Sequence, residues 1–256
     1  PNATATLKRA MRRETELVVT AFLREDLDAR QLLDPGFSFL TDELARHYGL
    51  PAVGGTEPKR TTLPAGARPG GLLGHGSVLM LTSKPDRTSV VHRGLWVLER
   101  LLCDTPPPPP ANVEPLPPQA PNGTSLRAQV EAHSTNPACA GCHQLIDPIG
   151  FGLESYDAVG AFRERDNGAP IDASGKLRDQ AFQGPAELAT LVRQDPALPA
   201  CIAEKMFTFA TGRSRQPADE GPLAELASTF AERGHRMREL LVEVATSATL
   251  TARCGR

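Results

Sequence analysis

The spacing of apolar residues predicts that the first hundred positions are largely helical. The segment "ETELVVTAFLREDLDARQLL" has the i, i+3, i+4 repeat of an amphipathic helix. Its apolar stripe consists of Leu17, Val18, Ala21 and Phe22. A shorter helix is expected across "FLTDELARHYG". Helical spacing returns in "RTSVVHRGLWVLERLLC", and we expect this helix to pack against the first one.

Glycine and proline interrupt this pattern between Val53 and Gly76. Only "KRTTL" resembles a strand there, so we expect a long loop with one short hairpin. Later in the chain, "NGAPIDASGKLRDQAFQG" favours extended structure and turns over helix.

The remaining pattern is again helical. "SLRAQVEAH" predicts a short helix, and Gly184-Pro185 opens another in "PAELATLVRQ". Three more helices follow, each with one apolar face. These faces consist of Ile202, Met206 and Phe209; of Leu223, Leu226, Ala227 and Phe230; and of Met237, Leu240, Leu241 and Val244.

A proline-rich segment, "CDTPPPPPANVEPLPPQAP", divides the chain. Proline fixes φ and lacks a backbone N–H, so this segment favours polyproline II, either as a semi-rigid spacer or as a strap along the surface. The sequence therefore predicts a mainly α protein: a helical lobe at 1–104, a proline-rich strap at 105–121 and an all-α lobe at 122–256.

Charge and cysteine content narrow the possibilities. The formal net charge is −2, so no broad basic field attracts nucleic acid or an anionic membrane. No apolar run approaches the roughly 20 residues that a membrane span needs. Besides Cys139 and Cys142, the chain has three cysteines. Cys103 could pair with Cys201, Cys201 could pair with Cys254, or all three could be free thiols.

Candidate chemistry concentrates in "CAGCH", Cys139 to His143. C-x-x-C-H is the attachment signature of c-type haem, in which two thiols add to the vinyl groups and the histidine binds the iron. A thioredoxin-like pair would need a βαβ unit, and a zinc site would need further ligands at finger spacing. A plain disulfide between Cys139 and Cys142 remains an alternative.

The surrounding sequence resembles the planctomycete-type cytochrome c proteins, large multidomain bacterial proteins. The block "HSTNPACAGCHQLIDPIGFGLESYDAVGAFR" carries the resemblance. So do four further blocks in the same order: "FSFLTDELARHYGLPAV", "GGLLGHGSVLMLTSKPDRTSVVHRGLWVLERLLCDTPPPPPANV", "IDASGKL" and "CIAEKMFTFATGR". Together they reach across most of residues 10 to 215.

The resemblance implies the C-terminal part of an exported protein, periplasmic or extracellular, with further domains ahead of Pro1. We expect one covalent haem c and electron transfer to a partner protein or a neighbouring haem domain. Two alternatives stay open. One is a haem-dependent oxidoreductase with an open sixth position on the iron, and the other is a non-catalytic interaction protein with a Cys139–Cys142 disulfide.

The iron's other axial ligand is not decided by the sequence. His47, in a family-like block, and Met206, in a helix after the motif, are the main candidates, and further candidates are His75, Met80, His92 and His133. A backbone carbonyl at Asp147 or Pro148, in a turn after the motif, is expected to accept from the ring of His143. For the haem propionates, the family-like blocks offer Tyr156, Arg163 and Arg213.

Overall fold

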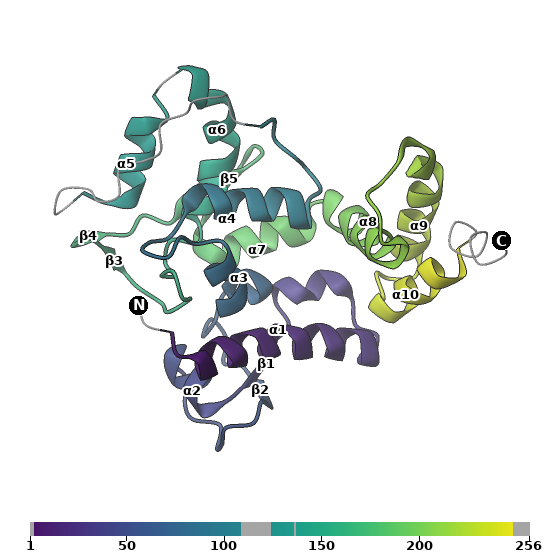
Figure 1. Cartoon of the computed structure of the whole chain (residues 1–256), viewed down its shortest axis with the longest axis horizontal. Helices are drawn as coiled ribbons and strands as arrows, with labels where there is room; N and C mark the ends of the chain where they lie inside the picture. The colour runs from purple at the N-terminus through teal and green to yellow at the C-terminus, as the bar shows by residue number, and fades with distance from the viewer. Residues whose placement is uncertain (1–2, 109–123, 136, 248–256) are drawn as a thin grey trace.

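The structure, a computed structural model, describes residues 3–108, 124–135 and 137–247. It confirms a mainly α protein (Figure 1). The helices are α1 (Ala5–Glu25), α2 (Asp42–His47), α3 (Gly76–Leu81), α4 (Val90–Trp96), α5 (Leu126–His133), α6 (Pro137–Phe151), α7 (Gly184–Gln194), α8 (Ala197–Thr211), α9 (Glu220–Glu232) and α10 (Met237–Thr246). A π-helical turn, η3 (Val97–Leu101), continues α4, and short 3-10 turns are η1 (Ala29–Leu33), η2 (Gly71–Gly74) and η4 (Pro217–Asp219).

The strands form small antiparallel ladders, β1 with β2, β3 with β4 and β5 with β6. They are β1 (Phe37–Leu40), β2 (Lys59–Thr62), β3 (Arg165–Asp166), β4 (Ala169–Pro170), β5 (Ser174–Leu177) and β6 (Gln180–Gln183). Two expectations were wrong. Residues 39–40 belong to β1 rather than to a helix, and the "KRTTL" strand pairs with β1, Phe37 opposite Thr62, rather than forming a hairpin inside its own loop.

The first helix begins and ends earlier along the chain than its apolar pattern suggested. It ends at Asp26, whose φ of 55° lies in the left-handed region, and the chain resumes as η1. Val18, Ala21 and Phe22 are buried as predicted. They pack against the C-terminal helices α8, α9 and α10 in a cluster that includes Phe207, Phe230 and Leu240, so the two ends of the described chain share a core.

The apolar face predicted for α8 was partly wrong. Phe207 is buried, but the side chain of Phe209 is 84% exposed and Met206 is only partly buried. A residue two positions from a buried one lies about 200° around a helix, so burial of Phe207 turns Phe209 outward.

Helix α4 packs against α6, not against α1 as the sequence suggested. Glycines make the approach possible. A Cβ on Gly94 of α4 would lie 2.1 Å from the carbonyl oxygen of Ile146, and a Cβ on Gly150 of α6 would lie 2.0 Å from that of Val90. The two backbones therefore touch where side chains would normally separate them. Figure 1 shows α4 crossing α6 rather than running alongside it.

The largest hydrophobic cluster draws on both sides of the proline-rich segment. Leu98 and Leu102, which precede it, pack with Ile149, Leu153 and other residues that follow it. Most of the predicted strap lies outside the described residues. The division at 105–121 stays a prediction, while the contact between α4 and α6 shows that residues from both predicted lobes share one core.

A disulfide joins Cys103 to Cys201, whose Cα atoms are 5.3 Å apart and whose positions differ by 98 in the sequence. Of the pairings that the sequence allowed, this is the one formed, and Cys254 lies outside the described residues. The bond ties the end of η3 to the first turns of α8. Cys103 adopts a φ of 51°, which L-residues rarely do, so the chain turns sharply there.

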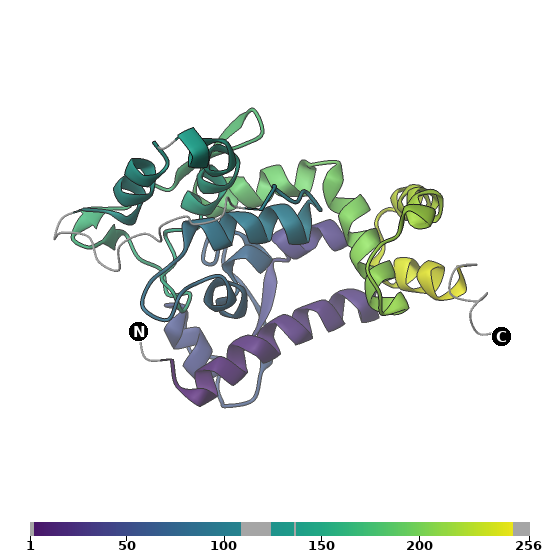
Figure 2. The same cartoon turned by 45° about the horizontal axis from the view of Figure 1, so that its top comes forward.

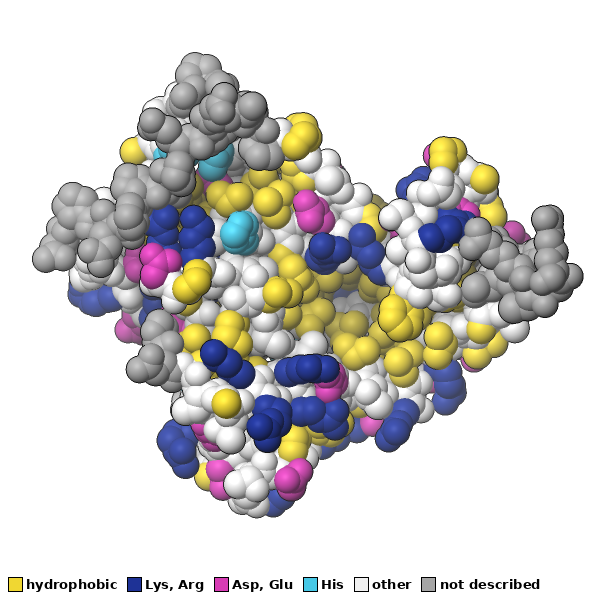
Figure 3. Space-filling model, viewed as in Figure 1, with side chains coloured by type: hydrophobic (Ala, Val, Ile, Leu, Met, Phe, Trp, Pro, Cys, Tyr) yellow, Lys and Arg dark blue, Asp and Glu magenta, His cyan; other side chains and the backbone are white. Residues whose placement is uncertain are grey.

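No helix among the described residues is both long and apolar enough to cross a membrane. On the face shown in Figure 3, Lys and Arg side chains gather over the end of the molecule where α1 and α2 lie.

We predict that Gly150→Ala destabilises the protein by about 2–3 kcal/mol, because the added methyl group meets backbone that cannot move aside. Gly221→Ala in α9 is the matched control. A Cβ there meets nothing within 4 Å, so higher helix propensity should stabilise by up to about 1 kcal/mol. Urea denaturation measures both changes. Equal effects of the two substitutions would contradict the close crossing.

We also predict that the Cys103→Ala/Cys201→Ala double variant loses about 4 kcal/mol of unfolding free energy, because the unfolded chain is freed from a loop of about 100 residues. The unfolding midpoint of the double variant should match that of the wild-type protein measured with reductant. A double variant as stable as the oxidised protein would show that the bond does not form in solution.

Candidate functional site

The C-x-x-C-H motif lies on α6, near the helix's first turn. The backbone of Cys139 is helical, and its side chain is outside the described structure. Cys142 is half-buried and packs against the largest hydrophobic cluster. Between the two cysteines, Gly141 is exposed, and a Cβ there would meet nothing within 4 Å. The helix thus turns one thiol toward the core and leaves open space beside the motif.

A carboxylate fixes the ring of His143. Nδ1 of His143 lies 2.7 Å from Oδ2 of Asp147, one helical turn later. Because an ionised carboxylate only accepts hydrogen bonds, Nδ1 donates, and Nε2 is the ring nitrogen left to bind a metal ion. The expected partner, a backbone carbonyl at Asp147 or Pro148, was wrong, and the expected turn was wrong too, since both residues lie inside α6.

Asp147 is itself buried, with 4% of its surface exposed. Its second oxygen, Oδ1, has no hydrogen-bond partner within the described structure. Burial raises the pKa of Asp147, while the hydrogen bond from His143 and the charges of His143 and His133 act in the opposite direction. The carboxylate therefore depends on His143 for its only described hydrogen bond.

A second imidazole faces this pair. The ring centres of His133 and His143 are 5.6 Å apart, and the ring planes are inclined by 74°. His133 is the last residue of α5, which packs against α6 through Leu126 and Val130. These three residues are spaced i, i+4 and i+7, so burial of the first two turns His133 toward α6. Figure 3 shows histidine side chains at the surface of this end of the molecule.

Two polar contacts hold the N-terminal turn of helix α5. The Ser125 side chain caps the helix by accepting from the N–H of Ala128 at 3.2 Å, and Asp166 Oδ2 accepts from the N–H of Leu126 at 2.9 Å. The guanidinium of Arg127 lies 3.9 Å from the centre of the Phe151 ring, at the end of α6. Packing and polar contacts together fix α5 beside the motif helix.

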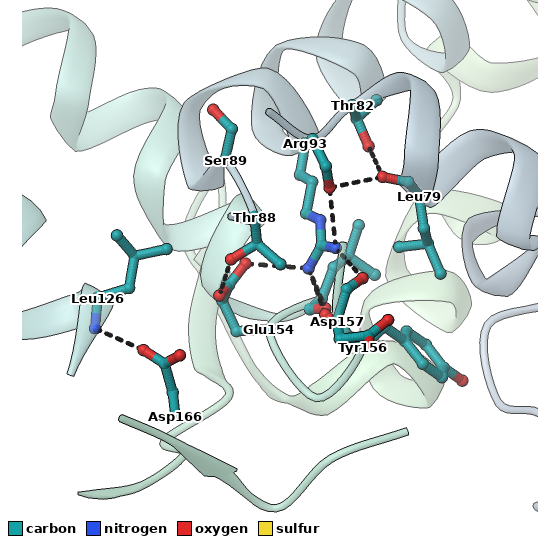
Figure 4. A network of polar contacts seen from close by, with 12 residues as sticks. Leu79, Thr82, Thr88, Ser89, Arg93, Leu126, Glu154, Tyr156, Asp157 and Asp166 are labelled. Carbon is teal, nitrogen blue, oxygen red and sulfur yellow. Dashed lines mark hydrogen bonds and ion pairs between the residues drawn. The ribbon is translucent and has the colours of Figure 1, made fainter. Parts of the chain in front are cut away.

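A buried arginine organises the segment that follows α6 (Figure 4). Arg93 of α4 is fully buried and donates to the carbonyl oxygens of Leu153, Tyr156 and Asp157 at 2.7–2.8 Å. It also pairs with Glu154 at 2.9 Å. The sequence pattern did not predict a role for this residue. Its only signal was a lone charge on the apolar side of the "VVHRGLWVL" helix.

The main candidates for the iron's other axial ligand lie away from the motif. His47, at the end of α2, has its Nε2 bonded to the carbonyl of Val159 at 2.9 Å. Met206, on α8, packs in the cluster that joins α1 to the C-terminal helices, not in the cluster that contains Cys142. In both cartoon views α2 and α8 are separated from the start of α6 (Figures 1 and 2).

The three propionate candidates also have other partners. Tyr156 is fully buried and donates to the carbonyl of Pro69 at 2.7 Å. Arg163 pairs with Glu154 and Asp166, each at 2.8 Å. Arg213 forms two bonds to Asp219 at 2.5 and 2.7 Å. No hydrogen bond in the described structure connects any of the three to Cys142 or His143, and their role with a propionate stays a prediction.

Three family models match the chain in consecutive segments. Residues 1–50 match a protein of unknown function (DUF1592), residues 69–166 match another (DUF1588, PSCyt3), and residues 178–250 match a third (DUF1585). These domains are associated with planctomycete cytochrome c proteins, and the matches support that family. The DUF1588 segment contains α4, α5 and α6, and so contains the whole candidate site. Neither the curated proteins nor the solved structures include a match to this chain.

Proposed function

We propose that this chain is a cytochrome c module that carries one covalent haem and transfers electrons within an exported protein. Cys139 and Cys142 would attach the porphyrin, and Nε2 of His143 would bind the iron. The observation that carries the proposal is the hydrogen bond from His143 to Asp147, because it fixes the tautomer that a metal ligand needs. The family matches support a cytochrome-related module independently.

The residues around the motif suit such a group. Gly141 leaves the helix surface open beside the cysteines, and Cys142 lies at the border of the apolar core. Within the described residues, no group of three or more His, Cys, Asp or Glu side chains is placed to hold a metal ion. A haem iron needs fewer protein ligands, because the porphyrin supplies four ligands and the chain supplies only one or two.

When bound, haem supplies an iron centre that exchanges one electron at a potential set by its ligands and surroundings. The chain's own contribution is to orient the ligand and to tune that centre. Asp147 holds His143 in one rotamer and places a buried negative charge behind it. The electrons would pass to a partner protein or to a neighbouring haem domain.

Export to the periplasm or the cell exterior is part of the proposal. Haem attachment to C-x-x-C-H requires two reduced thiols at the moment of reaction, and the mature protein also holds a disulfide between Cys103 and Cys201. Disulfides persist in oxidising compartments and are rare in the bacterial cytosol. The Cys103–Cys201 disulfide therefore favours an exported protein.

We predict that the protein, exported in a host that matures c-type cytochromes, gains the mass of one haem under denaturing conditions. Cys142→Ala should lose the covalent attachment or hold it by one bond only, with an altered reduced α-band, whereas His92→Ala, an exposed residue of α4, should keep both. Intact mass spectrometry and pyridine haemochrome spectra measure this. An unmodified mass with a Cys139–Cys142 disulfide would instead support the interaction-protein alternative.

We further predict that Asp147→Asn raises the reduction potential. Asparagine still accepts from Nδ1 but lacks the negative charge that favours the oxidised iron. A unit charge several Å away contributes about 2 kcal/mol at an effective dielectric of 20, which corresponds to roughly 90 mV for one electron. Asp179→Asn removes the same charge from a fully exposed side chain and is the control. Spectroelectrochemical titration should show a much smaller shift for it.

A further inference from the structure

We infer that His133 is the second axial ligand of the iron that His143 binds, so that the module has closed, bis-histidine coordination. This inference rests on the proposed function. It starts from the one imidazole that the structure places directly against the His143 ring, with ring centres 5.6 Å apart. The two histidines lie on different helices, so their approach results from tertiary packing rather than from local spacing.

The separation of the rings suits two ligands of one metal ion. Metal–nitrogen bonds of about 2 Å on each side, plus the distance from each nitrogen to its ring centre, separate two such imidazoles by roughly 6 Å. The observed 5.6 Å needs only a small outward shift of one ring. The steep inclination of 74° between the planes is compatible with axial ligation, because each ring can rotate about its own metal–nitrogen bond.

Helix α5 can hold this position without a ligand. Leu126 and Val130 are buried in a small cluster with Val90 and Phe151, and His133 is the next residue on the same face. Arg127 adds bonds to the carbonyl oxygens of Asp172 and Ser174. The helix is thus anchored at its N-terminal end, while His133 at the other end stands beside the motif and is only partly buried.

The other candidates are engaged or distant. Nε2 of His47 is bonded to the Val159 carbonyl, and Nδ1 of the buried His75 is 2.8 Å from the Thr15 hydroxyl. Met206 packs among the C-terminal helices, and Met80 packs against the cluster that joins α1 to α2. His92 is exposed on α4 and has no ring contact with His143 among the described residues. Of the candidates that the sequence offered, His133 is the one whose ring lies against that of His143 in the described structure.

Closed coordination decides between two of the functions that the sequence left open. An iron with two protein ligands transfers electrons without binding a substrate, whereas peroxide or oxygen chemistry needs an open or water-bound position. Two imidazoles also give a lower potential than the His/Met pair of many cytochromes c. The inference therefore identifies the module as an electron carrier with closed coordination and a low potential.

The test compares the matured wild-type protein with His133→Ala by visible and electron paramagnetic resonance spectroscopy. We expect oxidised wild type to be low-spin and six-coordinate, without the charge-transfer band of a Met–iron bond. His133→Ala should become high-spin, and added free imidazole should return it to low-spin. His92→Ala and Met206→Leu are the controls and should keep the wild-type spectrum.

The outcomes separate this inference from the proposed function. A covalently attached haem that is high-spin in wild type, or low-spin in His133→Ala without imidazole, overturns the inference and leaves the proposed function standing. A protein without attached haem overturns both. If His133→Ala does not fold, His133→Met decides. A Met–iron band and a raised potential would support ligation by residue 133, and an unchanged spectrum would overturn it.

Discussion

The close crossing of α4 and α6 is the constraint on which the rest of the structure depends. Gly94 and Gly150 face the backbone of the opposite helix, and each lacks the one atom that would push the helices apart. Because the backbones touch, Ile146 and Ile149 of α6 reach the same core as Leu98 and Leu102. This contact fixes the rotation of α6 about its own axis. The rotation of α6 in turn places Cys142 on the side of the helix that faces the core and His143 on the side that faces α5.

The second requirement is electrostatic. Burying Arg93 would be strongly unfavourable without partners, and the segment after α6 supplies them by turning three carbonyl oxygens and Glu154 toward it. Glu154 also pairs with Arg163, which pairs with Asp166, whose other oxygen accepts from the first N–H of α5. A continuous chain of charges thus runs from α4 to the helix that carries His133. The distance between the two imidazoles depends on this chain as well as on apolar packing.

The sequence predicted what local periodicity encodes. It identified the mainly α fold, the short helix α5 and the extended segment after α6. It left the cysteine pairing open, with the observed Cys103–Cys201 bond as one of the possibilities. It misplaced α4 because helical spacing shows that a face is buried but not which partner covers it. It missed the Arg93 network because its partners are backbone carbonyls more than fifty residues away, which leave no pattern in side-chain type. For the site, the motif located His143. Asp147 was expected to accept through its backbone carbonyl, but it accepts through its side chain. His133 was one of several candidate ligands, and spacing alone could not rank them.

The groups around His143 would all act on a bound iron in the same direction, by increasing its electron density. A buried carboxylate behind a ligating imidazole increases its electron donation, and a second imidazole adds another strong nitrogen donor. Both features stabilise the oxidised iron relative to the reduced iron. With the proposed ligands, the module would therefore have a low reduction potential and, once reduced, would donate electrons readily. Such a site gains nothing from a large pocket. It needs α5 and α6 held at one spacing, which the glycine crossing with α4 and the buried ion network provide.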